Sequence, residues 1–230
     1  MTRWPIARYL LSTHFVFLMF ILLCFYAACA VILGVAVVLT DITISTVDAA
    51  AQVLIWMALG YGASATGVLS TMMVHGRTRR EFLVQHPFFQ LVTTGTAAAL
   101  ITGAYAAENA VYRAFDWGQK VQEHRIYEST SDYPVIFAVY WCMLLTWMLV
   151  GVFVGAAFYR WEASGALALL PAAAVVLING GVTGFFSLPF NRIEVDGVLP
   201  VVGITAVLVA VTAAMLWATV RDIPLKTRAA

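Results

Sequence analysis

The sequence predicts an all-α fold, a polytopic bundle of membrane-spanning helices. Hydrophobic residues make up 62% of the 230-residue chain, charged residues make up only 11%, and the charged residues lie in gaps between long apolar runs. A soluble domain carries about 25% charged residues. Because this chain has more apolar sequence than a soluble core needs, the excess is expected to face lipid. The net charge of +1 gives no indication of a nucleic-acid partner.

Six apolar runs are long enough to cross a bilayer as helices. A spanning helix needs about 20 apolar residues. Six runs meet this length without Asp, Glu, Lys or Arg, namely residues 15–39, 49–74, 88–107, 134–159, 165–186 and 198–220. The third run is the weakest, because it is rich in Thr and Ala and begins beside Pro87. We therefore expect residues 1–230 to form a single transmembrane domain with six spans.

The distribution of basic residues predicts the orientation of the chain. With the N-terminus inside, six spans bring the C-terminus back to the cytoplasmic side, and nine of the 13 Lys and Arg residues then lie inside. These nine are Arg3, Arg8, Arg77, Arg79, Arg80, Arg160, Arg221, Lys226 and Arg228, whereas Arg113, Lys120, Arg125 and Arg192 lie outside. The acidic residues show the opposite bias, and Asp48 and Glu108 are expected in outer gaps. Both termini are therefore expected in the cytoplasm.

Three polar segments flank these spans. Residues 1–14 are either a basic flank that determines topology or an interfacial helix on the inner leaflet, with Pro5 suited to a first helical turn. The gap 108–133 is expected outside, and is either a lid or a solvated connector, since gaps of this length are often functional. The last outer gap, 187–197, is a short turn with helix breakers at both ends.

Small residues predict where helices touch. Gly151 and Gly155 form one G-x-x-x-G pair, and Gly180 and Gly184 form another. Glycines at this spacing let two backbones approach closely, which promotes helix pairing in lipid. The two pairs predict helix packing, either within one bundle or between the subunits of a dimer.

The apolar runs lack the residues that most membrane chemistry needs. They contain no ionisable side chain of the kind that ion-coupled carriers keep within their spans. The four histidines lie at run ends or in gaps, which argues against a pair of haem ligands. No metal-ligand spacing or glycine-rich phosphate loop occurs, and the three cysteines lie in apolar runs, where they are expected to pack as small hydrophobes. We therefore expect no enzyme activity and no cofactor in this chain, so that energy for active transport would come from another polypeptide.

The gap between the second and third runs, residues 75–87, contains a short basic segment. Burying each of its three arginines at mid-membrane would cost about 3 kcal/mol, so the gap must leave the bilayer. Gly76 can end the preceding helix, and Thr78 with Glu81 can form a capping box for a new one. We expect a short surface helix that Pro87 stops, with Phe82 exposed between arginines and able to enter a groove on a partner.

The segment Gly76-Arg77-Thr78-Arg79-Arg80-Glu81-Phe82 resembles the first cytoplasmic loop of ABC-2-type ABC transporter permeases, and is most similar to the small six-span permeases of bacterial ABC exporters. The turn at residues 160–165 is also similar to an inner turn of that family. In the family this loop is a coupling helix that docks into a separate ATP-binding subunit. The resemblance implies that role for Gly76, Arg77, Thr78, Arg79, Arg80, Glu81, Phe82 and Leu83.

The same resemblance implies the partners and the location. The chain would pair as a homodimer, or with a related permease, in the lipid of the bacterial cytoplasmic membrane. ATP and Mg²⁺ would bind the partner ATPase. The chain departs from larger members of the family in its long gap before the fourth span and in the little room for re-entrant helices before the sixth. The alternative function is a non-transporting anchor or assembly subunit of a larger complex. The residues select neither a substrate nor a transport direction.

Overall fold

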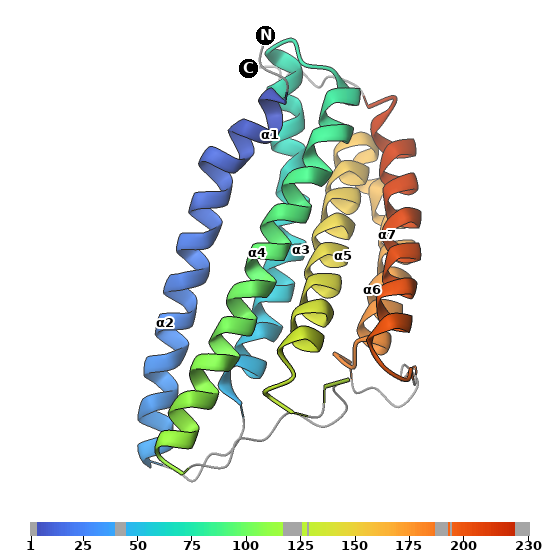
Figure 1. Cartoon of the computed structure of the whole chain (residues 1–230). Helices are drawn as coiled ribbons and strands as arrows, with labels where there is room; N and C mark the ends of the chain where they lie inside the picture. The colour runs from blue at the N-terminus through green and yellow to red at the C-terminus, as the bar shows by residue number, and fades with distance from the viewer. Residues whose placement is uncertain are drawn as a thin grey trace.

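The structure is a computed structural model that describes residues 4–39, 45–116, 126–127, 129–186, 193 and 195–223. Every regular element in these ranges is helical, which confirms the all-α prediction. The elements are α1 (Pro5–Tyr9), a π-helical segment (Leu10–Phe15), α2 (Val16–Leu39), α3 (Thr46–Val74), α4 (Arg79–Ala114), α5 (Tyr133–Trp161), a 3₁₀ segment (Glu162–Ala168), α6 (Leu169–Val182) and α7 (Val198–Val220). The long helices lie side by side and alternate in direction (Figure 1).

Four helical stretches among the described residues are long and apolar enough to cross a membrane. They are Pro5–Ile32, Thr46–Val74, Tyr133–Val182 and Val198–Val220. The chain therefore has the helices of a membrane protein, but this count is four and not the six that the apolar runs predicted.

The helix boundaries explain the difference. The expected run 88–107 forms the middle of α4, where frequent Thr, Gly and Ala residues lower the mean hydropathy. The expected runs 134–159 and 165–186 are joined by the 3₁₀ segment into one unbroken helical stretch. This stretch is sharply bent, because α6 returns alongside α5 (Figure 1). At the bend the two backbones touch, since a Cβ added to Gly165 would lie 2.7 Å from the carbonyl oxygen of Ala157.

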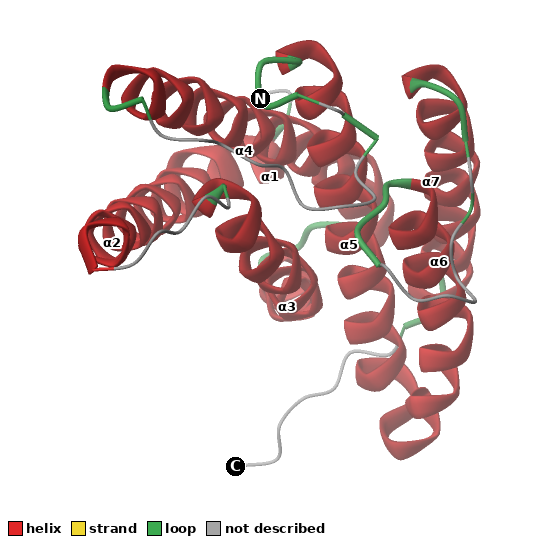
Figure 2. Ribbon diagram, turned by 90° about the horizontal axis from the view of Figure 1, so that it is seen from below, coloured by secondary structure: helices red, strands yellow, loops and turns green. Residues whose placement is uncertain are grey.

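Helix α5 is the centre of the bundle. It contacts α3 and α4 on one side and α6 and α7 on the other. Viewed along the bundle, α2 lies at one edge and α6 and α7 lie at the opposite edge (Figure 2). A helix that is apolar around its whole circumference belongs in the interior, and α5 meets this description with Trp147, Met143 and Tyr140 all buried.

The most extensive helix contact, between α3 and α5, depends on glycine. A Cβ added to Gly151 would collide with the carbonyl oxygen of Leu59, and one added to Gly155 would collide with that of Ala63. From the other side, a Cβ on Gly62 would collide with the carbonyl oxygen of Met148. The first G-x-x-x-G pair therefore lies directly against the backbone of α3.

The second glycine pair has different surroundings. A Cβ added to Gly180 would collide with the ring of Phe186, which follows α6 in the same chain. Gly184 has a φ of 69° just beyond the end of α6, a conformation that glycine adopts without strain. Gly184 thus takes part in the turn that ends this helix.

The N-terminal segment is docked on α4. The side-chain oxygen Oε1 of Gln85 accepts hydrogen bonds from the backbone N–H groups of Ile6 (2.8 Å) and Ala7 (3.1 Å). Ile6, Ala7 and Leu10 are buried, and the Trp4 ring lies 5.6 Å from that of Phe88. Residues 5–15 therefore continue directly into α2 as one helical stretch that is held to the bundle at its start.

Replacing Gln85 with alanine is expected to release α1 from α4. The first turn of α1 would lose the acceptor for two N–H groups, at a cost of about 1–2 kcal/mol. Hydrogen–deuterium exchange of the Ile6 and Ala7 amides should then accelerate about ten-fold. The control is Ser12→Ala, because the Ser12 hydroxyl bonds only the exposed Tyr9 carbonyl in its own helix. Equal exchange in Gln85→Ala and the unaltered protein would contradict the docking role.

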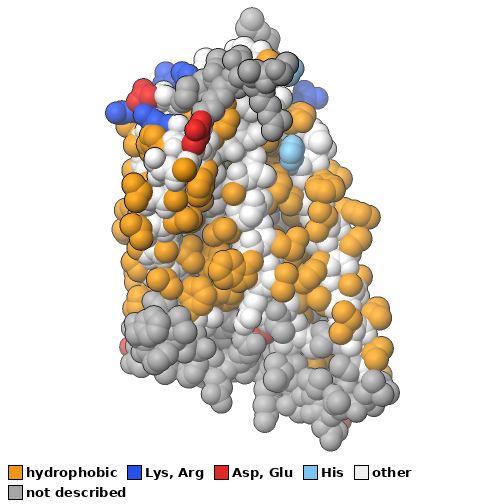
Figure 3. All heavy atoms as spheres, turned by 180° about the vertical axis from the view of Figure 1, so that it is seen from behind, with side chains coloured by type: hydrophobic (Ala, Val, Ile, Leu, Met, Phe, Trp, Pro, Cys, Tyr) orange, Lys and Arg blue, Asp and Glu red, His pale blue; other side chains and the backbone are white. Residues whose placement is uncertain are grey.

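The surface has the charge pattern of a membrane protein. Among the described residues, Arg side chains gather at one end of the molecule, and an apolar belt covers the helices below them (Figure 3). Among the described residues, this basic end carries Arg8, Arg77, Arg79, Arg80, Arg160 and Arg221, while Arg113 lies at the opposite end of α4. The start of α2 and the end of α7 lie at this same basic end (Figure 1).

Candidate functional site

The basic turn, residues 75–80, joins α3 to α4 and is fixed at both sides. Gly76 adopts a φ of 75°. Its N–H bonds the Met73 carbonyl (3.0 Å), and the N–H of Arg77 bonds the Met72 carbonyl (3.0 Å). These are the two hydrogen bonds of a Schellman motif, which ends a helix sharply. Gly76 therefore ends α3, as its sequence position indicated.

A capping box starts α4. The Thr78 hydroxyl accepts from the N–H of Glu81 (3.1 Å), and the Glu81 carboxylate accepts from the N–H of Thr78 (2.9 Å). Glu81 also lies 3.9 Å from Arg77 on the exposed surface. Because each end of the turn is held by two hydrogen bonds, the basic turn has little freedom to move independently of the two helices.

The expected short surface helix is not a separate element. Helix α4 begins at Arg79 and continues through Pro87 to Ala114, so the prediction that Pro87 stops it is wrong. Proline removes one N–H and crowds the carbonyl of Leu83. Packing compensates for this local loss, since Gln85, His86 and Phe89 on both sides of the proline are buried against neighbouring helices.

The expected exposure of Phe82 is also wrong. Phe82 is only 1% exposed, and its ring stacks on that of His86 with 4.7 Å between centroids. Burial lowers the pKa of His86 to about 3, and nearby His14 acts in the same direction, so His86 is neutral near pH 7. The side chains that the basic turn presents to solvent are instead His75, Arg77, Thr78 and Arg80.

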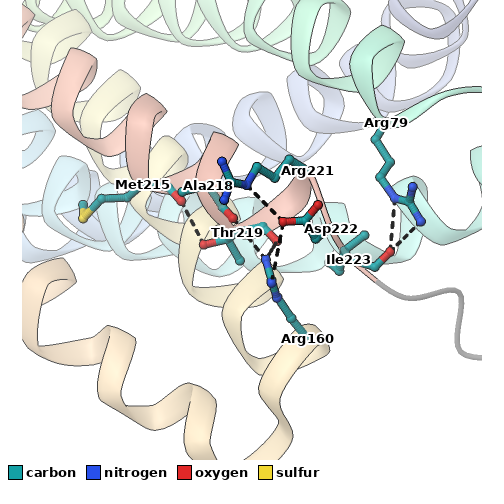
Figure 4. Close-up of polar contacts among 8 residues, drawn as sticks. All are labelled: Arg79, Arg160, Met215, Ala218, Thr219, Arg221, Asp222 and Ile223. Atoms are coloured by element: carbon teal, nitrogen blue, oxygen red, sulfur yellow. Dashed lines mark hydrogen bonds and ion pairs between the residues drawn. The ribbon is translucent and has the colours of Figure 1, made fainter.

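Arg79 and Arg160 bind the end of α7 (Figure 4). The Arg79 guanidinium donates to the Ile223 carbonyl from Nε (3.1 Å) and from one Nη (2.7 Å). Arg160 donates to the carbonyls of Ala218 (3.0 Å) and Thr219 (2.8 Å). Cations at a helix C-terminus satisfy its last carbonyls and oppose its dipole.

These contacts bring together two segments that are far apart in the sequence. The basic turn and the turn after α5 are the two segments on which the family resemblance depends. Arg160 binds the last turn of α7, and Arg79 binds Ile223 just beyond it. Asp222 lies beside this contact, where it accepts from Arg221 (3.0 Å) and lies 4.0 Å from Arg160.

The opposite end of the bundle contains a buried acid–tyrosine cluster, formed by Asp48, Tyr105, Tyr127 and Tyr140. Asp48 is fully buried in the first turn of α3. One oxygen of its carboxylate accepts from the hydroxyls of Tyr127 (3.2 Å) and Tyr140 (3.1 Å). The Tyr105 hydroxyl lies 3.0 Å from that of Tyr127 and 3.1 Å from that of Tyr140.

Each phenol carries a single O–H proton. If Tyr127 and Tyr140 donate to Asp48, Tyr105 must donate to one of these two tyrosines. All three hydroxyls of the cluster then have an acceptor, and the carboxylate is the final acceptor of the network. The cluster joins α3, α4 and α5 to the segment that carries Tyr127.

Glu108 forms a second buried contact beside this cluster. Its carboxylate accepts from the Ser45 hydroxyl (2.6 Å), from the Thr46 N–H (2.8 Å) and from the Thr46 hydroxyl. These donors belong to the N-terminus of α3, where a negative charge is favoured by the helix dipole. Glu108 thus connects the last part of α4 to the first turn of α3.

The sequence placed Asp48 and Glu108 in gaps between spans, and it gave no indication that either side chain is buried. A signal for the start of α3 was present, because Ser45 and Asp48 have the spacing of a helix cap, and the Asp48 N–H lies 3.4 Å from the Ser45 hydroxyl. In the described part of the chain, no group of three or more His, Cys, Asp or Glu side chains is arranged to hold a metal ion.

Several predicted features fall outside the described residues. These are much of the outer gap (117–125 and 128), most of the last outer turn (187–192 and 194), and the termini 1–3 and 224–230. Comparisons of the chain with models of protein families, with curated proteins and with solved structures gave no match.

Proposed function

We propose that the chain is the membrane-spanning permease subunit of an ATP-driven ABC exporter in the bacterial cytoplasmic membrane. The basic turn would dock against a separate ATP-binding subunit, in the role that its sequence resemblance implies. One observation carries the proposal. An exposed, arginine-bearing turn is fixed by a Schellman motif on one side and by a capping box on the other, at the basic end of a bundle of apolar helices.

The proposal includes six passes through the membrane with both termini in the cytoplasm. Helix α4 lies beside α3 and α5 along the bundle (Figure 1), so its less apolar middle section would cross at the same depth as its neighbours. The bend at the 3₁₀ segment would make α5 and α6 two passes. The basic end would then face the cytoplasm, in agreement with the positive-inside rule.

The helix contacts support a transmission role for the basic turn. A displacement of the basic turn would move α3 and α4 with it, because the hydrogen bonds of the Schellman motif and of the capping box hold the turn to both helices. Helix α3 packs on α5 with backbone contact at Gly151 and Gly155, and Arg79 connects the start of α4 to the end of α7. Closure of two ATPase subunits would therefore shift α3, α4, α5 and α7 together. ATP and Mg²⁺ would be bound by the ATPase.

A non-transporting membrane anchor or assembly subunit is the second candidate. One observation favours it. In the most apolar part of the first spanning stretch, Pro5–Ile32, only 6% of the residues are buried within the chain. A membrane partner that covered α2 would use this surface without any need for ATP hydrolysis. A homodimer, or a dimer with a related permease, would serve the first candidate in the same way.

Reversing the exposed charges of the basic turn tests the docking role. Arg77→Glu with Arg80→Glu is expected to abolish recovery of an ATP-binding subunit when tagged chain is purified from its native membranes. Both arginines are exposed, so membrane insertion should be retained. Arg79 and Phe82 are unsuitable positions, because Arg79 holds the end of α7 and Phe82 is buried. ATP hydrolysis by the recovered complex is the second measurement.

The matched control is Arg113→Glu. It makes the same charge reversal on an exposed arginine of α4, but at the opposite end of the bundle, and should leave ATPase recovery unchanged. Recovery of the ATPase with the double variant would contradict docking through the basic turn. Failure of the unaltered chain to recover any nucleotide-hydrolysing subunit would favour the anchor. A gene for an ATP-binding cassette protein beside that of the chain would favour the permease.

A further inference from the structure

Two cavities lie end to end between α2 and the rest of the bundle. The first, of about 330 Å³, is lined on α2 by residues from Phe17 to Leu22 and on α4 by residues from Thr93 to Ile101. The second, of about 430 Å³, begins at Leu23 on α2 and reaches Tyr112 on α4. Both volumes fall in the range of about 300–1,000 Å³ that is typical of small-molecule sites.

The dimensions of this groove between α2 and α4 select its occupant. From Thr93 to Tyr112 the groove follows α4 for 19 residues, or about 28 Å at 1.5 Å per residue. The two cavities together enclose much less than the volume of a helical segment of that length, since a helix is about 10–12 Å across. A single hydrocarbon chain is thin and flexible enough to fit.

The walls agree with such an occupant. Apart from Thr93 and Thr94, the first cavity is lined by aliphatic and aromatic side chains and by Gly60. Polar groups are more frequent in the second cavity, whose lining includes Tyr26, Thr46, Glu108 and Tyr112. The groove is therefore apolar toward the basic end and polar toward the opposite end, which is the polarity of an amphiphile.

A buried hydroxyl marks the polar part of the groove. The Tyr26 hydroxyl is buried and has no hydrogen-bond partner among the described residues, and the same is true of the Thr93 hydroxyl. Thr93 can rotate toward the carbonyl one turn earlier in its own helix, as Thr94 does toward Gln90 (2.7 Å). Tyr26 has no such local acceptor. Because a buried polar group without a partner is costly, the site calls for a ligand with a hydrogen-bonding group beside Tyr26.

We propose that the groove binds a long-chain membrane amphiphile, with its hydrocarbon chain along α2 and α4 and its hydrogen-bonding head beside Tyr26 in the second cavity. Entry would be lateral from the bilayer, since α2 contacts α3 but makes little contact with α4 or α5. If the chain is the permease proposed above, this class of amphiphile is its substrate. That last step rests on the proposed function, whereas binding to the groove does not.

Photolabelling of the purified chain tests the site without any ATPase. The chain is reconstituted in vesicles that contain phosphatidylcholine with a diazirine at the end of one acyl chain. Saturable labelling is expected on residues 17–22 and 93–101, with competition by unlabelled lipid. A second probe, with the diazirine beside the headgroup, should label residues 104–112 instead. Since both results concern only lipid and chain, their failure is distinct from failure of ATPase docking.

Two glycines allow the groove to be filled. Gly60 lines the first cavity and Gly34 lines the second, and a Cβ on either would meet no atom within 4 Å. Gly60→Leu with Gly34→Leu should retain the fold, because leucine is the better helix former, and should reduce labelling by both probes several-fold. The matched control is Gly203→Leu, an exposed position on α7 with equally open space, which should label normally.

The proposal is overturned if labelling rises in proportion to probe without saturating, or spreads over α6 and α7. It is also overturned if the filled variant labels as the unaltered chain does, or if the two probes label the same residues. Cross-links between two copies through residues 17–34 would show that a second chain, and not a lipid, occupies this surface. If the filled variant misfolds, the position-dependent labelling of the unaltered chain decides between these outcomes.

Discussion

Replacing Gly151 and Gly155 with alanine is expected to break the contact between α3 and α5. Each added methyl group would collide with a carbonyl oxygen of the α3 backbone. A backbone in a helix cannot move aside as a side-chain tip can, so the helices must separate. Overpacking of this kind costs about 1–3 kcal/mol for each site. In lipid, close packing is itself a main source of helix association. Separated helices would therefore not recover the lost free energy through other interactions.

The measurement is thermal unfolding of the purified chain in detergent, with aggregation followed on the same samples. Gly62→Ala should have a similar effect from the α3 side, because its methyl group would collide with the Met148 carbonyl oxygen. The matched control is Gly103→Ala with Gly203→Ala, where nothing lies within 4 Å of the added Cβ. These changes should leave stability unchanged, or raise it by about 0.5–1 kcal/mol for each site through helix propensity.

Loss of stability in the control variants would contradict this interpretation, because it would show that any alanine at a helical glycine is harmful. The same conclusion would follow if the Gly151 and Gly155 variant unfolded at the temperature of the unaltered chain. A dimer contact makes a different prediction, since it would change the oligomeric state of the chain while leaving the folded subunit intact.

Local patterns in the sequence predicted local structure well. The positive φ of Gly76 and the capping box of Thr78 and Glu81 depend only on residues within one turn of each other, and all are present. The glycine spacing at residues 151 and 155 marked one face of α5. It did not identify Gly62 as the residue opposite, because that pairing joins positions far apart in the sequence and depends on the angle at which α3 and α5 cross.

The errors occur where packing overrides a local rule. Proline usually ends a helix, and the sequence therefore predicted that α4 would end at Pro87. The helix instead continues past Pro87, because residues on both sides of the proline are buried. Phe82 followed two arginines and was therefore placed on the surface. Its side chain is buried, and its ring stacks on that of His86. A charge pattern along the sequence does not show which face of a helix is buried until its neighbours are known.

The acid–tyrosine cluster was missed for a related reason. The pattern of charges correctly placed Asp48 near the end of a helix, but it carried no information on whether the carboxylate is buried. Asp48 belongs to the first turn of α3, where it is fully buried against the hydroxyls of Tyr127 and Tyr140. The tyrosine partners lie 57 to 92 positions away in the sequence, the farthest being Tyr140, so no motif could connect them.

Replacing Asp48 with alanine is expected to destabilise the end of the bundle opposite the basic turn. The hydroxyls of Tyr127 and Tyr140 would lose their shared acceptor, the Asp48 carboxylate. Without that acceptor, the direction of the hydrogen bonds between Tyr105 and these two tyrosines would no longer be fixed. Each buried polar group left without a partner costs about 1–3 kcal/mol. Asp196→Ala is the matched control, because it removes an exposed carboxylate from the same end of the molecule and should change the free energy of unfolding by less than about 0.5 kcal/mol.

Removing the partners as well distinguishes a hydrogen-bond network from a simple packing contact. Asp48→Ala combined with Tyr105→Phe, Tyr127→Phe and Tyr140→Phe leaves no phenol of the cluster without its acceptor. Because deleting both members of a buried pair costs much less than deleting one, the combined variant should regain part of the stability lost in Asp48→Ala. If the losses simply add, the tyrosines contribute through their rings alone, and the carboxylate is not the acceptor that holds α3, α4 and α5 together.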